Sequence, residues 1–237
     1  MVLAGCAASL GEQRPDDPQL ATPTSSPWQQ WPQTRAEEWA AWPGPEAATW
    51  GAWLAQRAAQ LKGIDSLKSI SRRVPDDCTG FVRLTYWNAG TELLGVEAEP
   101  NDNGVTAIYR HALALGALHW HTPGAGDLVF FVETYDRNHD GKRNDGLTHV
   151  GIVESVEPDG TVVFMHRVNS GVRESRLNLR HPLETAGPHH EAWNEVLRGA
   201  TKKMRSYLTG ELFAAFASAE ELVRGRPLAN PALASRP

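Results

Sequence analysis

Apolar residues recur with the spacing of a helix in three segments of the first half of the chain. The first segment runs from Pro45 to Leu61, with Gly63 as its terminator, and its apolar face consists of Trp50, Trp53, Leu54, Ala58 and Leu61. The second begins at Cys78 and ends near Gly90. The third is marked by Val105, Ile108, Leu113 and Leu115, with Gly116 as its terminator. The pattern therefore predicts three helices before residue 117.

After residue 126 the spacing changes to that of strands. Runs of β-branched and aromatic residues predict strands over 128–132, 148–153, 161–166 and from 171 to about 179. A last apolar face predicts a C-terminal helix over 209–225, and it consists of Leu212, Phe213, Phe216 and Leu222. Helices followed by an antiparallel sheet indicate an α+β domain.

The two ends of the chain lack such patterns. Residues 10–45 are rich in Pro, Gln, Ser, Thr and Asp, which is typical of a disordered tether, and residues 226–237 form a tail rich in Pro and Ala. One domain remains over 46–225, with its core at 70–180. A length of 237 residues with 41% hydrophobic content agrees with a single domain that carries a core.

The charge balance narrows the class of partners. The formal net charge is −5, with 23 basic and 28 acidic residues. A chain without a basic field has no electrostatic means of holding a phosphate backbone, so we exclude nucleic acid as a partner. No run of about 18 apolar residues is present, so we expect no membrane-spanning helix.

The first nine residues contain one of the two cysteines. Leu3-Ala-Gly-Cys6 resembles the lipobox of bacterial lipoproteins, in which the cysteine is lipidated and becomes the first residue of the mature protein. Most of a signal peptide is missing, so either translation starts upstream or the match arises by chance. Under the first alternative, residues 1–9 are a signal remnant and Cys6 is the lipidation site. The protein is then a lipoprotein of the bacterial cell envelope or periplasm, held on the membrane through its lipid anchor only.

The second cysteine lies at a predicted helix start. Asp76 and Asp77 precede Cys78 and suit a helix cap, while Thr79, Gly80 and an apolar run follow it. The start of a helix carries partial positive charge, so we expect it to favour the thiolate and to lower the pKa of the thiol. Gly80 would let a substrate backbone approach closely. The alternative is a small, inert cysteine in the core.

Two histidines stand on neighbouring predicted strands. His149 opens the second strand and His166 ends the third. Antiparallel pairing would set the two imidazoles side by side, and the helix start would bring Cys78 to His149. A cysteine hydrolase needs a thiolate, a base beside it and a group that orients the base, so we assign Cys78, His149 and His166 to these roles. A buried structural residue is the alternative for each histidine.

Four segments together resemble a known family. They are Asp77-Cys78-Thr-Gly-Phe-Val82, Gly126-Asp127-Leu-Val-Phe-Phe131, His149-Val-Gly-Ile-Val153 and Phe164-Met-His166. Their order is similar to that in NlpC/P60 cysteine peptidases, which belong to the papain-like superfamily together with CHAP domains. The resemblance implies a papain-like α+β fold with Cys78 as nucleophile, His149 as base and His166 as third member. A histidine in third place resembles NlpC/P60 more than CHAP.

The resemblance also implies a thiol protease acting on the cell wall. The implied substrate is the stem peptide of peptidoglycan, cleaved at the γ-D-glutamyl–diaminopimelate bond, and the reaction requires no cofactor. Three alternatives stay open: a CHAP-like amidase that cuts between sugar and peptide, a non-catalytic wall-binding module on the same fold, and an acyl-transfer enzyme on other amides or lipids. A binding module has no need of all three Cys/His/His residues, which favours an enzyme.

An acidic insertion separates the first two predicted strands. Asp136, Asn138 and Asp140 stand at positions 1, 3 and 5 of an EF-hand-like calcium loop, with Gly141 at position 6. Position 12 is not a glutamate, so we expect Asp145 at position 10 to act instead. The two hypotheses are a structural calcium site of modest affinity and a polar hairpin tip held by Asx turns.

Two further candidates precede the first predicted strand. Asp127 either contacts the substrate or bonds its own backbone in a turn, and we favour the turn. His119 and His121 either line the substrate groove or lie in a loop.

Overall fold

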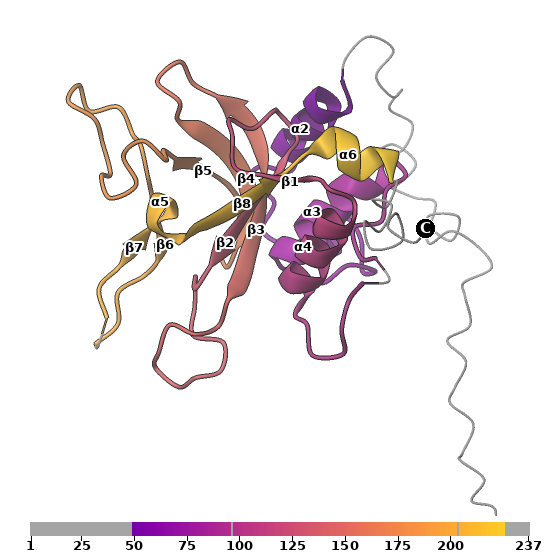
Figure 1. Cartoon of the computed structure of the whole chain (residues 1–237), viewed down its shortest axis with the longest axis horizontal. Helices are drawn as coiled ribbons and strands as arrows, with labels where there is room; N and C mark the ends of the chain where they lie inside the picture. The colour runs from indigo at the N-terminus through magenta and orange to yellow at the C-terminus, as the bar shows by residue number, and fades with distance from the viewer. Residues whose placement is uncertain (1–48, 96, 203, 226–237) are drawn as a thin grey trace, which may run out of the picture. The chain divides into compact units, whose positions relative to one another are not determined.

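The structure, a computed structural model, describes residues 49–95, 97–202 and 204–225 (Figure 1). The segment with Cys6, the predicted tether and the predicted tail lie outside these residues, so the lipobox and the tether stay predictions. Within the described ranges, no helix has both the length and the apolar content needed to cross a bilayer.

Three helices form where the apolar spacing predicts them. They are α2 (Trp50–Gln60), α3 (Cys78–Trp87) and α4 (Gly104–Ala114), and a 3-10 turn, η2 (Leu67–Ser69), lies between the first two. Each of these three α-helices begins with a side-chain cap, since oxygens of Thr49, Asp77 and Asn103 accept a hydrogen bond from the first turn. The expected helix start at Pro45 lies outside the described residues.

The buried face of α4 differs from the predicted one at one position. Leu113 is 57% exposed, so its assignment to the apolar face is wrong. Besides Ala107, the buried residues of this helix and its C-cap are Val105, Ile108, Ala112 and Leu115. These follow one another at spacings of three and four, and Leu113 falls beside that stripe rather than on it.

All four predicted strands form, within an antiparallel sheet of six. They are β2 (Leu128–Val132), β3 (Leu147–Val156), β4 (Val162–Val168) and β5 (Gly171–Leu177). With β1 (Leu118–His119) and β8 (Phe213–Ala217) the order is β1-β8-β2-β3-β4-β5. A separate two-stranded sheet consists of β6 (Val196–Arg198) and β7 (Tyr207–Leu208). The predicted α+β class is confirmed.

The predicted C-terminal helix over 209–225 is wrong. The segment contains α5 (Thr209–Leu212), strand β8 and α6 (Ala219–Arg224). β8 inserts between β1 and β2, where Phe216 pairs with Val129. Its alanines and phenylalanines suit a helix locally. As a strand they gain a hydrogen-bonded neighbour on each side, and this tertiary pairing overrides helix propensity.

The two faces of the sheet pack against different elements. α2, α3 and α4 contact β3 and cover one face, whereas α5 and the small sheet lie on the other side (Figure 1). The core on the second face consists of Val129, Phe131, Val153, Val162, Phe164, Leu177, Leu212 and Phe216. His149 pairs with Phe131 across the strands, so its side chain shares that second face.

Candidate active site

Cys78 is the first residue of α3, as the sequence predicts. The Oδ1 atom of Asp77 accepts hydrogen bonds from the main-chain N–H of Gly80 at 2.9 Å and from the hydroxyl of Thr79 at 2.7 Å. The cap thus satisfies the N–H of the third helical residue. The N–H groups of Cys78 and Thr79 remain beside the sulfur, where they favour negative charge.

Asp76 fixes the segment that leads to Cys78. Its carboxylate accepts hydrogen bonds from the hydroxyl of Ser66 at 2.7 Å and from the N–H of Leu67 at 2.9 Å. It also forms an ion pair with Arg167 at 3.1 Å. Because Arg167 directly follows His166, this pair ties the approach to Cys78 to the strand that carries the third predicted site residue.

Gly80 does not have the role expected from the sequence. It is buried, and a Cβ at this position would overlap the carbonyl oxygen of Pro75. The expectation that a substrate backbone approaches Gly80 is wrong, since the chain's own backbone occupies that space. Glycine is needed here so that the capping segment can fold back against α3.

His149 of β3 and His166 of β4 lie next to each other. The Nε2 atom of His149 is 2.9 Å from Nδ1 of His166, and the two rings are nearly perpendicular at 82°. Gly151 follows His149 on the same face of β3. A Cβ there would lie 2.9 Å from the ring of Phe164 and 3.3 Å from the Cβ of His166. The missing side chain therefore leaves room for the pair of imidazoles.

Cys78 and His149 line one cavity of about 550 Å³. The other lining residues are Asp76, Asp77, Thr79, Asn103, Gly104, Val105, Thr134, Tyr135, Thr148, Arg167, Val168, Asn169 and Leu197. The main-chain N–H of Val150, next to His149, donates a hydrogen bond to the thiol. His166 is 3% exposed and lies behind His149. The structure therefore brings all three predicted residues together and opens two of them to a ligand.

Burial determines the protonation state of the thiol. Desolvation raises the pKa of Cys78 to about 12, and the charge of Asp77 raises it too, while the N–H groups of Val150, Thr79 and Cys78 lower it. The expectation that the pKa of this thiol is lowered is wrong. The helix start does favour the thiolate, but removal of the sulfur from water outweighs that effect.

The histidine pair is uncharged for the same reason. Burial lowers the pKa of His149 to about 4, although the charge of Asp77 opposes this change. Burial, and then the neighbouring His149, hold the pKa of His166 well below its usual value. A neutral imidazole can accept a proton. The thiol of Cys78 and the imidazole of His149 are therefore both neutral in the resting site.

Sequence analysis missed the polar groups behind His166. The hydroxyl of Ser175 on β5 is 3.0 Å from Nε2 of His166, and it donates to the carboxylate of Glu195 at 2.9 Å. The position of Ser175 could have been predicted from the sequence. The tight hairpin between β4 and β5 pairs Ser175 with Phe164, which shares a face with His166.

The acidic loop between β2 and β3 is held by Asx turns. Main-chain N–H groups donate to oxygens of Asp136, Asn138, Asp140 and Asp145 at 2.8–3.1 Å. Among the described residues, Oδ1 of Asp136 and Oδ2 of Asp145 are shielded from water and accept no hydrogen bond. In the same part of the chain, no three His, Cys, Asp or Glu side chains are arranged to hold a metal ion. The loop therefore has two bare carboxylate oxygens but not a complete carboxylate cage.

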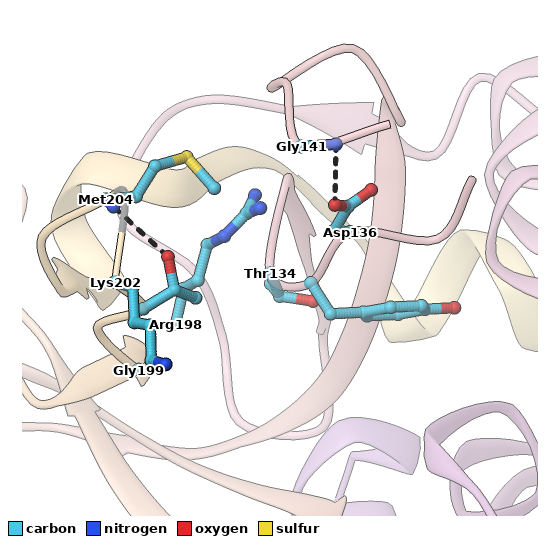
Figure 2. A pocket seen from close by; sticks show the side chains of 9 residues that line it. Thr134, Asp136, Gly141, Arg198, Gly199, Lys202 and Met204 are labelled. Atoms are coloured by element: carbon cyan, nitrogen blue, oxygen red, sulfur yellow. Dashed lines mark hydrogen bonds between the residues drawn. The ribbon is translucent and has the colours of Figure 1, made fainter. Parts of the chain in front are cut away.

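A second cavity of about 450 Å³ adjoins the first, and the two share Thr134 and Tyr135. Figure 2 shows Arg198 and Lys202 on one side of it, and Asp136 with Gly141 on the other. Arg198 is 4% exposed and donates to the main-chain oxygen of Glu133 at 2.7 Å. The acidic loop thus forms one wall of a cavity next to the one that Cys78 lines.

Asp127 and His119 lie away from both cavities. The carboxylate of Asp127 accepts hydrogen bonds from the N–H groups of Gly124 and Ala219, each at 2.8 Å, and lies 3.1 Å from Nε2 of His119. The turn interpretation of Asp127 is confirmed. The groove hypothesis for His119 and His121 is wrong, because these histidines line a different cavity.

Comparison with protein families agrees with this geometry. The family model of the CHAP domain matches residues 69–167, a segment that contains Cys78, His149 and His166. Searches of the curated proteins and of the solved structures gave no match. The matched segment ends within β4, so β5, the small sheet and β8 lie beyond it. This match supports a papain-like peptidase domain of the CHAP and NlpC/P60 type over residues 69–167.

Proposed function

We propose that this protein is a cysteine-type hydrolase of peptidoglycan. CHAP domains are usually cysteine- and histidine-dependent amidases or peptidases of that polymer. The observation that carries the proposal is the 2.9 Å contact between His149 and His166, at the cavity that Cys78 lines. A wall-binding module gains nothing from a thiol, a buried base and an orienting group in contact, so the hydrolase is favoured over the non-catalytic alternative.

The reaction uses the two neutral groups directly. As the sulfur of Cys78 attacks the amide carbonyl, His149 takes the thiol proton, and it then gives that proton to the leaving amine as the C–N bond breaks. Water hydrolyses the resulting thioester with His149 again as the base, and the thiol re-forms. The N–H groups of Cys78 and Thr79 at the start of α3 stabilise negative charge at the reacting centre.

Within this class we propose cleavage of the stem peptide at the γ-D-glutamyl–diaminopimelate bond. Support comes from the resemblance of the four sequence segments to NlpC/P60 peptidases. The match to CHAP favours a second candidate, an amidase that cuts between sugar and peptide. Neither reaction requires a cofactor for the proton transfers described above.

Digestion of purified peptidoglycan tests the proposal. We expect the wild-type protein to release soluble fragments and Cys78→Ala to release none, while His189→Asn, a change at an exposed histidine that lines neither cavity, behaves as wild type. The fragment masses separate the two candidates, because an amidase frees whole stem peptides and an endopeptidase frees fragments that begin at diaminopimelate. Equal release by wild type and Cys78→Ala contradicts the proposal.

We also propose that the protein is an envelope lipoprotein anchored through Cys6. The lipobox-like residues 3–6 support this. Expressed with a complete signal sequence, the wild type should partition into detergent and Cys6→Ser should not. A wild-type protein that stays entirely in the aqueous phase would show that the match is accidental.

A structural calcium ion in the loop 136–145 is a separate proposal. The unpartnered oxygens of Asp136 and Asp145 support it, and they fit the preference of calcium for carboxylate ligands. Arg137, Lys142 and Arg143 offset part of the loop's negative charge, so the affinity should be modest. The ion would hold the loop that leads into β3 and would not take part in the proton transfers.

A further inference from the structure

A continuous line of hydrogen bonds runs inward from the base. The Nε2 atom of His149 lies 2.9 Å from Nδ1 of His166, whose Nε2 lies 3.0 Å from the hydroxyl of Ser175. That hydroxyl lies 2.9 Å from the carboxylate of Glu195. Three of the four residues are buried, with exposed fractions of 8% for His149, 3% for His166 and 6% for Ser175. Water therefore has little access to these groups and cannot readily replace the hydrogen bonds between them.

The carboxylate of Glu195, the last group in the line, determines which atom donates and which accepts in each hydrogen bond. A carboxylate can only accept hydrogen bonds, so the single proton of the Ser175 hydroxyl points to Glu195. The Ser175 oxygen then accepts from His166, which must carry its proton on Nε2. The Nδ1 atom of His166 is left as an acceptor, so His149 must also carry its proton on Nε2. The bare nitrogen of His149 is then Nδ1, the one that takes no part in the line.

Glu195 is held in place by contacts outside the sheet. Its main-chain N–H donates to the hydroxyl of Thr209 at 3.3 Å, and its carbonyl accepts from the N–H of Thr209 at 2.9 Å. The preceding Asn194 is 3% exposed and donates to the carbonyls of His181 and Glu184 at 2.8 and 2.9 Å. These contacts hold the segment before β6 against α5 and the loop that follows β5, and the carboxylate of Glu195 lies 2.9 Å from the hydroxyl of Ser175.

We propose that Ser175 and Glu195 are positioning residues that fix the tautomer of the histidine pair and keep Nδ1 of His149 free as the base. Without them, each neutral imidazole has two tautomers, and only one leaves the base nitrogen unprotonated. Both residues lie beyond the segment 69–167 that matches the CHAP family model. The kinetic consequence rests on the proposed hydrolase function, whereas the tautomer assignment does not.

Nitrogen chemical shifts of the imidazoles test the assignment directly in the full chain, with no substrate present. We expect wild type to show both histidines protonated on Nε2 alone. In Glu195→Gln the new amide can donate to Ser175, whose proton is then free to point at His166. The donor and acceptor in each hydrogen bond between Ser175, His166 and His149 then exchange roles, and in part of the molecules both rings carry their proton on Nδ1. Ser175→Ala should also give mixed tautomers, whereas Ser175→Thr, which keeps the hydroxyl, should restore the single form.

Glu174→Gln is the matched control. Glu174 precedes Ser175 on β5, but its carboxylate pairs with Lys62 and Arg176 on the other side of the strand. It should leave the tautomers unchanged. If Glu195→Gln and Ser175→Ala both fold and keep the wild-type tautomers, the inference is wrong.

Wall hydrolysis supplies the second measurement. We expect Glu195→Gln and Ser175→Ala to lower kcat by about 10- to 100-fold with little change in KM, as for the loss of other groups that orient a histidine. Glu174→Gln should keep the wild-type kcat. An inactive wild type with fixed tautomers would overturn the hydrolase proposal and leave this inference standing. An active wild type whose two variants keep full kcat would overturn the positioning role alone.

Discussion

Lowering the pH from 7.5 to 4.5 should destabilise the folded protein through His149. Burial lowers the pKa of this imidazole to about 4, whereas its ordinary value is 6.5. Between these two values the unfolded chain binds a proton at this residue and the folded chain does not. The stabilisation is therefore fully present above pH 6.5 and is lost as the pH falls toward 4.

The size of the effect follows from the difference between the two pKa values. Each pH unit within that interval removes about 1.4 kcal/mol, so the free energy of unfolding should fall by about 2–3 kcal/mol by pH 4.5. His166 acts in the same direction, since burial also holds its pKa below the usual value. A loss of this size is a large part of the 5–15 kcal/mol typical of a domain.

Urea unfolding followed by tryptophan fluorescence measures this loss. Wild type and His189→Asn, a change at an exposed histidine, should lose about 2–3 kcal/mol more between pH 7.5 and 4.5 than His149→Asn does. The comparison removes contributions from other acidic groups, because all three proteins share them. Parallel pH curves for wild type and His149→Asn would falsify the assignment of a buried, neutral base.

The raised pKa of Cys78 predicts slow alkylation by iodoacetamide at pH 7, with a rate that keeps rising to pH 10; a plateau below pH 8 would contradict it. Substitution His149→Ala should lower wall hydrolysis by about 10²–10⁴-fold and His166→Ala by less, and negligible losses from both would remove the triad. Adding a methyl group in Gly151→Ala, against Phe164 and His166, should cost about 1–3 kcal/mol in urea unfolding. Gly199→Ala, with no described atom within 4 Å, should cost nothing measurable, and equal stabilities would refute the crowding argument. Calcium at about 100 times its Kd should raise the free energy of unfolding by about 2.7 kcal/mol, and Asp145→Ala should abolish the gain while hydrolysis persists. A melting temperature that is the same in calcium and in chelator would leave the loop as a hairpin tip.

Sequence patterns correctly predicted the helices and strands that form through interactions within their own segment. The helix that starts at Cys78 and the strand that starts near His149 each depend on the spacing of their own side chains, and both form as expected. The prediction of a helix in the C-terminal segment failed because Phe213–Ala217 pairs with strands that are far away in the sequence. Alternation along one segment carries no information about such neighbours.

The electrostatics of the site were predicted with the wrong sign for a related reason. A sequence shows that Cys78 starts a helix, but the burial that raises its pKa comes from elements that pack around it. Ser175 was within reach, because the hairpin register places it on the face of His166. Glu195 was not, because Asn194 and Thr209 place it through contacts between segments with no repeating pattern.

Strand β8 comes last among the strands of the described residues but lies inside the sheet. While the protein is being synthesised, β2, β3, β4 and β5 can pair as soon as each has emerged, yet one edge of β2 stays open until Phe213–Ala217 has followed. During that interval Leu128–Val132 offers free N–H and C=O groups between apolar side chains, which is the kind of edge that foreign strands join. Chains that stop short of β8 should therefore accumulate as aggregates rather than as a shortened folded protein.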